Sequence, residues 1–314
     1  MGEEKLSFEN IIGNDENKRL LCNSIINKNI VHSYLFYGAD GIGKKIFAKE
    51  FAKMILCNEK DDKKPCNKCK SCIEFNSDNN PDFFIIEPDG NSIKIDQIRQ
   101  MQKSVMEKPI ESTKKVYIID NCHLMTKEAQ NCMLKTLEEP QEYIVIILIA
   151  ANENNILSTV KSRCTKIFFK EIDDNEIFKY VGNKYDEVGI ENDLIRLCSG
   201  SISKADYIIS KIDMLNQVKK IINEVDKCNK LHFIQNNQLI YDNKVEIDLL
   251  LEYIYILLFQ EVMKNNKKSD VYIKSMKTVE KTKIKLQNSN NFDMTIDNML
   301  INIWEEINEK NNRC

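Results

Sequence analysis

A glycine-rich segment between a short apolar run and a helical pattern is the feature that most constrains the fold. Residues 38–45 read Gly-Ala-Asp-Gly-Ile-Gly-Lys-Lys, with the glycines and the first lysine of a phosphate-binding loop. The strand-like run Ser33–Tyr37 precedes it, and Phe47, Phe51 and Ile55 follow at helical spacing. In such a loop, backbone N–H groups at a helix N-terminus surround an anion, and the lysine adds a positive charge. This order predicts a nucleotide-binding α/β fold.

Two positions depart from the pattern of a hydrolytic ATPase. Lys45 stands where Ser or Thr would hold magnesium, and the apolar run Val116–Ile119 ends in Asp120 followed by Asn121, where a second carboxylate is expected. An ammonium group cannot replace the hydroxyl, and an amide cannot act as a base toward water. We therefore expect an ATPase fold that does not hydrolyse ATP. The sequence leaves open whether the loop still binds ATP or ADP. It also leaves open whether Asp120 only hydrogen-bonds the loop. The candidate nucleotide-binding residues are Gly38, Gly41, Gly43, Lys44, Lys45 and Asp120.

The remaining apolar runs extend this fold. Those of strand length cover residues 83–86, 116–119, 144–149 and 166–169. Helical patterns over 96–106 and 126–139 separate them, and the second must end near Pro140. With the strand before the glycine loop, the chain predicts five parallel strands joined by crossover helices.

Four of the eleven cysteines form a cluster. Cys57, Cys66, Cys69 and Cys72 give the spacing C-x8-C-x2-C-x2-C, in which two overlapping turns bring thiolates to one tetrahedral ion. Because four thiolates complete a tetrahedron, we expect a closed, structural Zn(II) site; the alternative is a surface loop of reduced cysteines without metal. Nearby lysines would offset its charge of about −2, namely Lys63, Lys64, Lys68 and Lys70.

Charge and hydropathy argue against several classes of protein. A net charge of −3 over 314 residues does not favour a surface that binds nucleic acid throughout, although it is compatible with a local basic patch. The N-terminus has no apolar core after a basic start, so we expect no signal peptide. The most apolar run, 247–259, contains Asp248 and Glu252 and is too short and too charged to span a bilayer. We expect a soluble, cytoplasmic protein with reduced cysteines.

Further motifs follow one another in a specific order. They are His32-Ser33-Tyr34-Leu35-Phe36, the cysteine insertion, Ile93–Arg99, Leu134-Lys135-Thr136-Leu137-Glu138-Glu139-Pro140 and Ser162-Arg163-Cys164. In this order they resemble the subunits of the bacterial DNA polymerase III clamp loader, and within that family the delta-prime branch. Motifs carry the resemblance over about residues 8–210. The C-terminal third shares only its helical character.

The resemblance implies a fold and a domain organisation. Clamp-loader subunits are built on AAA+ modules, so we expect an α/β AAA+ P-loop module over residues 1–170 that includes the zinc insertion at 57–72. A small helical lid domain over 171–210 and an all-α collar domain over 211–314 would follow, the collar holding the assembly together. An apolar stripe in the collar favours core packing over an interface, and its members are Ile296, Met299, Leu300, Ile303, Trp304 and Ile307.

The resemblance also implies residue roles and partners. In this family the Ser-Arg-Cys arginine reaches the ATP of a neighbouring subunit, so Arg163 would be an arginine finger acting in trans; the alternative is an arginine in a surface salt bridge. Residues 150–152 and 200–204 lack the sensor residues of the catalytic members, which favours delta-prime over the gamma/tau ATPase. The expected partners are the gamma/tau and delta subunits and, through the complex, the sliding clamp and primer-template DNA.

Three functions follow from these patterns. The leading one is a non-hydrolysing clamp-loader subunit that supports ATP-dependent loading of the sliding clamp. The second is an active gamma/tau-like ATPase, which would need another carboxylate in place of Asn121 and would have to hold magnesium without Ser or Thr at position 45. The third is a zinc-dependent nucleic-acid-binding module, which would predict tight and strongly salt-dependent DNA binding by the isolated chain.

Overall fold

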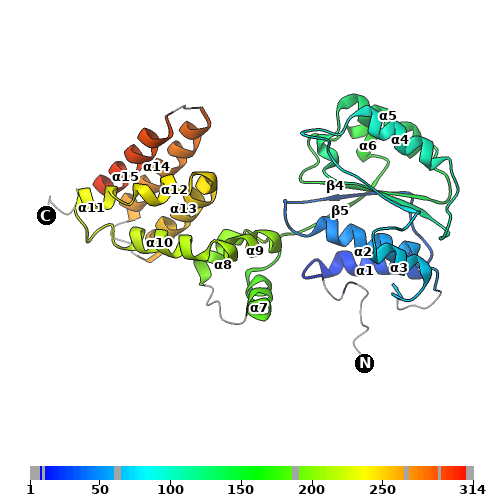
Figure 1. The fold of residues 1–314 in the computed structure, drawn as a ribbon, viewed down its shortest axis with the longest axis horizontal. Coiled ribbons are helices and arrows are strands. Elements are labelled where there is room, and N and C mark those ends of the chain that lie inside the picture. Colours follow the sequence, from blue (N-terminus) through cyan, green and yellow to red (C-terminus); the bar gives the residue numbers. More distant parts are fainter. Residues whose placement is uncertain are drawn as a thin grey trace. The chain divides into compact units, whose positions relative to one another are not determined.

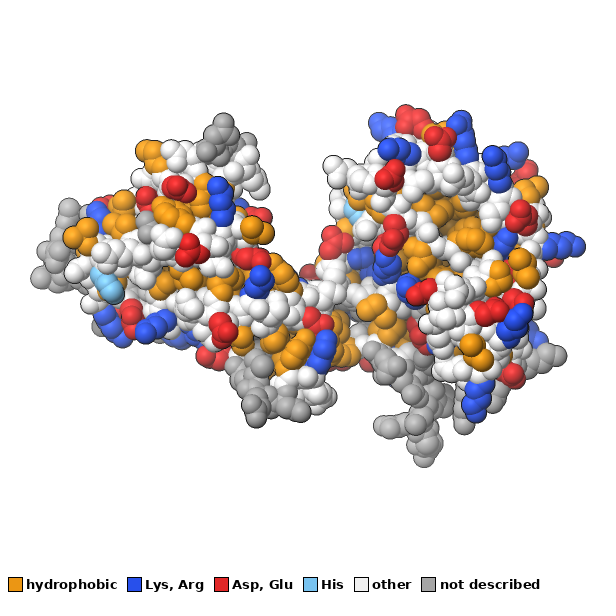
Figure 2. Space-filling model, viewed as in Figure 1, with side chains coloured by type: hydrophobic (Ala, Val, Ile, Leu, Met, Phe, Trp, Pro, Cys, Tyr) orange, Lys and Arg blue, Asp and Glu red, His pale blue; other side chains and the backbone are white. Residues whose placement is uncertain are grey.

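The chain folds into two compact units. The computed structural model describes residue 8 and residues 11–59, 65–185, 191–264, 269–288 and 291–308. Unit 1 comprises Met1–Ile177 and Gly200–Ser203, and unit 2 comprises Phe178–Ser199 and Lys204–Cys314. Within the described ranges, no helix has both the length and the apolar character needed to cross a membrane. On the face drawn in Figure 2, acidic and basic side chains are interspersed over each unit.

Unit 1 is built on a five-stranded parallel sheet with the strand order β2-β3-β4-β1-β5. The strands are β1 (Ser33–Tyr37), β2 (Phe83–Ile86), β3 (Lys115–Ile119), β4 (Ile144–Ala150) and β5 (Thr165–Phe168). The predicted parallel α/β sheet is therefore confirmed. Three runs differ by a residue: β3 begins at Lys115, β4 continues to Ala150, and β5 covers Thr165–Phe168 instead of 166–169. The buried ring of Phe169, just after β5, packs against Phe36 and Phe47.

Helices cover both faces of this sheet (Figure 1). One face carries α1 (Asp15–Ile26), α2 (Lys44–Leu56) and α3 (Lys70–Asn76), and the other carries α4 (Ile95–Val105), α5 (Lys127–Glu138) and α6 (Ser158–Lys161). Successive side chains of β4 alternate between the two cores: Val145, Ile147 and Ile149 pack with α2, whereas Ile146 and Leu148 pack with α4 and α5. This double burial explains why β4 is a continuous apolar run.

Unit 2 contains helices and no strand among its described residues. Its elements are α7 (Asp174–Lys184, which begins in unit 1), α8 (Asn192–Cys198), α9 (Ile202–Ser210, likewise), α10 (Ile212–Asn223), α11 (Lys230–Ile234), α12 (Asn237–Asp242), α13 (Ile247–Lys264), α14 (Ser269–Asn288) and α15 (Phe292–Asn308). The apolar stripe of α15 is buried except for the partly exposed Trp304, whose indole N–H donates to the carbonyl of Cys228 at 3.1 Å.

A buried polar group joins three helices of unit 2. Asp193 of α8 accepts hydrogen bonds from the hydroxyl of Tyr253 on α13 at 2.6 Å and from Lys219 Nζ on α10 at 2.9 Å. Burial alone would raise the pKa of Asp193, but these two bonds lower it. The same lysine also pairs with the exposed Glu191, so the ion pair has one face toward solvent.

Candidate functional site

The glycine loop joins β1 to α2 and has a conformation that its glycines permit. Gly43 caps α2 with φ of 89° and Gly41 has φ of 76°, both in the left-handed region. A Cβ on Gly41 would lie 2.3 Å from Ser201 Oγ, and that hydroxyl donates to the Gly41 carbonyl at 2.9 Å. The segment at Gly200–Ser203 therefore packs directly on the loop.

Lys44 is turned into the loop. Its side chain is buried, and Nζ donates to the carbonyls of Gly38 at 2.8 Å and Ala39 at 2.6 Å. Burial lowers the pKa of Lys44, and the charges of Asp40 and Asp120 oppose that shift in part. The ammonium group that would meet a phosphate is thus bonded to the loop itself.

Lys45 lies between two carboxylates. Its Nζ is 3.0 Å from Asp120 Oδ2 and also forms an ion pair with Glu87. Burial alone would lower the pKa of Lys45, but the hydrogen bonds to Glu87 and Asp120 raise it, and the bond to Lys45 lowers the pKa of Glu87. Where a hydrolytic P-loop protein holds magnesium through a hydroxyl and an aspartate, this chain has an ammonium group on the aspartate.

Glu87 is a site residue that the sequence patterns did not single out. Ile86 of β2 is paired with Ile119 of β3, so the residues that follow these strands lie at the same edge of the sheet. Glu87 directly follows its apolar run just as Asp120 does, and that shared position is the signal from which it could have been predicted.

The residue after Asp120 has a special backbone conformation. Asn121 has φ of 51°, and its backbone N–H donates to Asp120 Oδ1 at 3.0 Å. A 3-10 turn at Cys122–Leu124 follows, and the Nδ1 atom of His123 accepts from the backbone N–H of Ala151 at 3.4 Å. Asp120 thus accepts hydrogen bonds from Lys45 and from the backbone N–H of Asn121, at the start of this turn.

Arg163 lies away from this loop, between α6 and β5. Its NH2 group donates to Glu138 Oε1 at 2.6 Å, and NH1 donates to the carbonyl of Thr159 at 2.9 Å. The Arg163 carbonyl accepts from the buried hydroxyl of Ser33, the first residue of β1, at 2.6 Å. The side chain is 34% exposed, so a surface salt bridge exists and the guanidinium also reaches solvent.

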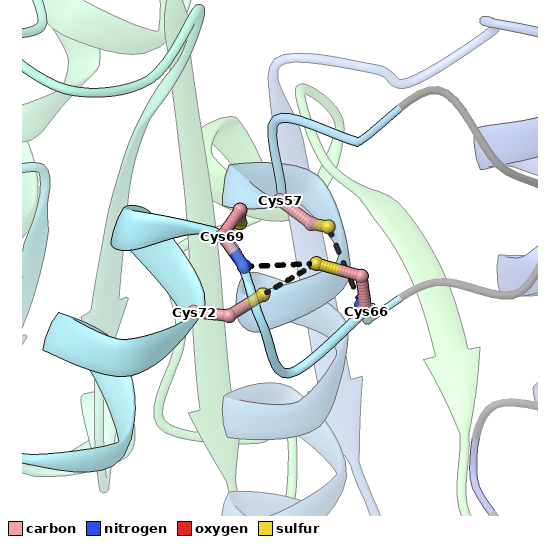
Figure 3. A group of neighbouring side chains, drawn as sticks. All are labelled: Cys57, Cys66, Cys69 and Cys72. Atoms are coloured by element: carbon pink, nitrogen blue, oxygen red, sulfur yellow. Dashed lines mark hydrogen bonds between the residues drawn. The ribbon is translucent and has the colours of Figure 1, made fainter.

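The four clustered cysteines converge on one point (Figure 3). Cys57 follows α2, Cys66 lies in the next loop, Cys69 caps α3 and Cys72 lies in its first turn. The four sulfur atoms all lie within 4.8 Å of one another, and those of Cys66 and Cys72 are 3.9 Å apart. Four sulfurs at about 2.3 Å from a zinc ion would be about 3.8 Å apart, so the cluster fits a tetrahedral Zn(II) site.

The structure describes part of the polar surroundings of the cysteine cluster. Burial alone would raise the pKa of Cys66, but N–H groups of Lys68 and Cys69 lower it to about 7. The side chain of Lys70 pairs with Glu111 and Glu74. Lys63 and Lys64 lie outside the described residues. Among the described residues, backbone N–H groups therefore stabilise the thiolate of Cys66.

Comparisons with known proteins identify the family. Residues 13–173 match the family described as "DNA polymerase III, delta subunit". The chain is 39% identical to the delta' subunit of DNA polymerase III from Bacillus subtilis over 154 residues, which are 49% of this chain and 46% of that one. It is 33% identical to the gamma/tau subunit from Mycoplasma pneumoniae over 221 residues, 68% of this chain and 32% of that one.

Another relative and a solved structure are also described as DNA polymerase III proteins. The tau subunit from Bacillus subtilis is 37% identical over 165 residues, 52% of this chain and 29% of that one. A solved gamma subunit-related protein of DNA polymerase III from Thermotoga maritima aligns at 19% identity and a TM-score of 0.48, covering 92% of this chain and 99% of that one. The chain spans less than half the length of the curated relatives named here. From the match over residues 13–173, the chain belongs to the DNA polymerase III delta-subunit family of clamp-loader proteins.

Proposed function

We propose that this chain is a non-hydrolysing subunit of the DNA polymerase III clamp loader and supports ATP-dependent loading of the sliding clamp by its partner subunits. The observation that carries the proposal is the position of Lys45 Nζ, which is bonded to both Asp120 and Glu87. Magnesium in a P-loop site needs the aspartate oxygen and a hydroxyl. Here the oxygen already has a cation, and residue 45 has no hydroxyl.

Charge at the loop supports the same conclusion. Without a metal, Lys44 lies 3.9 Å from Asp40, and Lys45 pairs with Glu87 and Asp120, so carboxylates of the chain already compensate both lysines next to the site for polyphosphate. Lys44 would also have to leave the carbonyls of Gly38 and Ala39 to reach a phosphate. Compensated lysines attract phosphate less, and two hydrogen bonds of Lys44 would have to be broken, so both features disfavour nucleotide.

We propose that Arg163 acts on a neighbour's ATP. A guanidinium offers fixed, planar donors to phosphate oxygens and transfers no proton, so it can assist a reaction that takes place in another chain. Arg163 is partly exposed and contacts Ser33 at the start of β1, whereas the glycine loop follows the other end of that strand, so its position suits a role outside this chain's own loop.

We further propose that Cys57, Cys66, Cys69 and Cys72 hold one structural zinc ion. The convergence of four sulfurs supports it, and a closed site of four thiolates leaves no position for a substrate. Two hydroxyl groups hold this cysteine segment to the end of α2: Ser71 of α3 and Ser112 both donate to the carbonyl of Leu56, the last residue of α2, at 2.8 Å. Zinc would therefore stabilise a segment that is already held to this helix.

In the proposed assembly, residues 1–170 form the AAA+ module, 171–210 the lid and 211–314 the collar, and the partners are the gamma/tau ATPase and delta subunits.

The test of the proposed function is reconstitution of the chain with those partner subunits, the sliding clamp and primed DNA. The pure chain should hydrolyse ATP at background rate, and Lys44→Ala should leave clamp loading unchanged. ATP hydrolysis by the pure chain that Lys44→Ala abolishes would favour the active-ATPase alternative. Loading that proceeds equally without the chain would contradict the proposal.

A further inference from the structure

The two most specific sequence segments of unit 1 meet in one ion pair. Glu138, from the Leu-Glu-Glu-Pro segment, is the last residue of α5, and Arg163, from Ser-Arg-Cys, follows α6. Their side chains join at 2.6 Å through Oε1 and NH2, across 25 positions of sequence. Both side chains are partly exposed, so neither is needed to fill the core.

The guanidinium is fixed on one side and free on the other. NH1 is used by the carbonyl of Thr159, with the Ser162 hydroxyl at 3.5 Å, and one N–H of NH2 is used by Glu138. Within the described part of the chain, Nε and the second N–H of NH2 have no acceptor. These are the donors that an acceptor from another molecule could use.

The position of Glu138 is not explained by the stability of α5. A carboxylate in the last turn of a helix faces the negative end of the helix dipole, and Glu139 adds a second negative charge there. Glu138 has no hydrogen bond or ion pair among the described residues other than that with Arg163. The ion pair with Arg163 is therefore the favourable interaction that offsets the unfavourable position of this carboxylate at the end of α5.

We propose that Glu138 is a positioning residue for Arg163: it holds the guanidinium in the orientation in which its remaining donors meet the phosphate of a neighbouring subunit. The inference rests on the proposed trans role of Arg163. An arginine side chain samples many rotamers, and a group that is oriented before reaction avoids that loss of freedom in the transition state. Thr159 fixes one terminal nitrogen and Glu138 the other, so removing the carboxylate frees one end of the fork.

The expected effect is modest and specific. A partly exposed ion pair has a small energy, so Glu138→Ala should slow hydrolysis at the adjacent site about three- to fivefold, which corresponds to about 0.6–1 kcal/mol. Glu138→Gln keeps an oxygen acceptor and should lose less. Glu139→Ala removes a neighbouring charge that has no partner among the described residues, and should leave the rate unchanged.

The experiment measures ATPase activity of the reconstituted loader containing wild-type chain, Glu138→Ala, Glu138→Gln, Glu139→Ala, Arg163→Ala or the double variant Glu138→Ala/Arg163→Ala. Each loss is expressed as a fraction of that caused by Arg163→Ala, which removes the contribution of the other ATPase sites. The proposal requires that the double variant be no slower than Arg163→Ala alone, because a positioning residue has no effect once its arginine is gone. Thermal unfolding of each chain verifies that the variants are folded.

The outcomes are distinguishable. If Arg163→Ala is slow and Glu138→Ala is as fast as wild type, the positioning role is wrong and the trans role stands. A further loss from Glu138→Ala in the absence of Arg163 would show that the carboxylate acts through the structure of the chain, which also overturns the inference. If Arg163→Ala itself has no effect, the trans role fails, and the positioning role fails with it.

Discussion

Replacing Lys45 by threonine should convert the glycine loop into a magnesium-dependent nucleotide site. Lys45→Thr completes the P-loop pattern, because the hydroxyl follows Lys44 as it does in proteins that bind magnesium nucleotides. The change also removes the ammonium group from Asp120 and Glu87 and leaves two carboxylates at one edge of the sheet. A divalent ion would then have carboxylate and hydroxyl ligands, and the ammonium group that was bonded to both carboxylates would be gone.

The two ion pairs of Lys45 set the magnitude. The lysine is 39% exposed, so each pair contributes about 0.2–1 kcal/mol, and their loss with the resulting repulsion should destabilise unit 1 by about 1–2 kcal/mol. For a domain of this size that is a fall in Tm of about 3–6 °C in the presence of a chelator. Magnesium nucleotide at a hundred times its Kd should restore about 2.7 kcal/mol, a rise of about 5–10 °C.

The assay is thermal unfolding with ADP and magnesium, with ADP and a chelator, and with neither. Lys45→Met is the matched control, since it removes the same charge without supplying a hydroxyl; it should lose stability as Lys45→Thr does and gain nothing from magnesium nucleotide. The reasoning is refuted if the two variants respond alike, or if the wild-type chain is stabilised by magnesium ADP as much as Lys45→Thr.

Three further predictions follow from the described contacts. Arg163→Ala should assemble normally and slow ATP hydrolysis at the one adjacent site by about 10³-fold or more, with a smaller loss for the whole ring. Arg163→Lys should restore little activity, because lysine lacks the planar guanidinium fork. Equal ATPase and clamp-loading rates for Arg163→Ala and wild type would contradict this prediction. Metal analysis of protein purified without chelator should give one zinc per chain, with less than about half an equivalent counting against the site, and Cys69→Ser should increase proteolysis of residues 57–72 while the sheet stays folded. Asp193→Asn should lower the unfolding free energy by about 1–3 kcal/mol at pH 7. Because folding lowers the pKa of Asp193, its contribution is present above the unfolded pKa of about 3.9 and is lost as pH falls through the folded value. The gap between wild type and Asp193→Asn in chemical denaturation should therefore close below about pH 4, and a gap that is unchanged at pH 3 would contradict the assignment.

The sheet of unit 1 could be predicted because each strand is a short apolar run beside a turn or a helical pattern. The run Phe83–Ile86 coincides with β2, and Val116–Ile119 is β3 less its first residue, Lys115. That lysine is buried, and its Nζ reaches the carbonyl of Ser104 at the end of α4 at 3.0 Å, a contact that a polar residue in sequence does not announce. Local periodicity therefore identified the strands but not the polar contacts at their ends.

The candidate site was predictable only in its local part. The glycines, Lys44, Lys45 and Asp120 follow from spacing along the chain. The pairing of Lys45 with Glu87 depends on the register between β2 and β3, and the contact of Ser201 with Gly41 spans 160 positions. A motif covers only a short window of sequence, whereas these contacts join residues that are far apart along the chain. They could therefore be identified only from the folded structure.

The strand order of unit 1 has a consequence for the timing of folding. β1 is synthesised first, yet it pairs with β4 and β5, so residues 33–37 have no partner strand until residues 144–150 exist. Loop-closure entropy opposes such non-local pairing, which makes it a late step. We expect nascent chains that end before β4 to remain sensitive to protease, and chains extended past β5 to become resistant once the missing neighbours can close around the first strand. Protection of a chain that ends at residue 143 would show that β1 is ordered by another route.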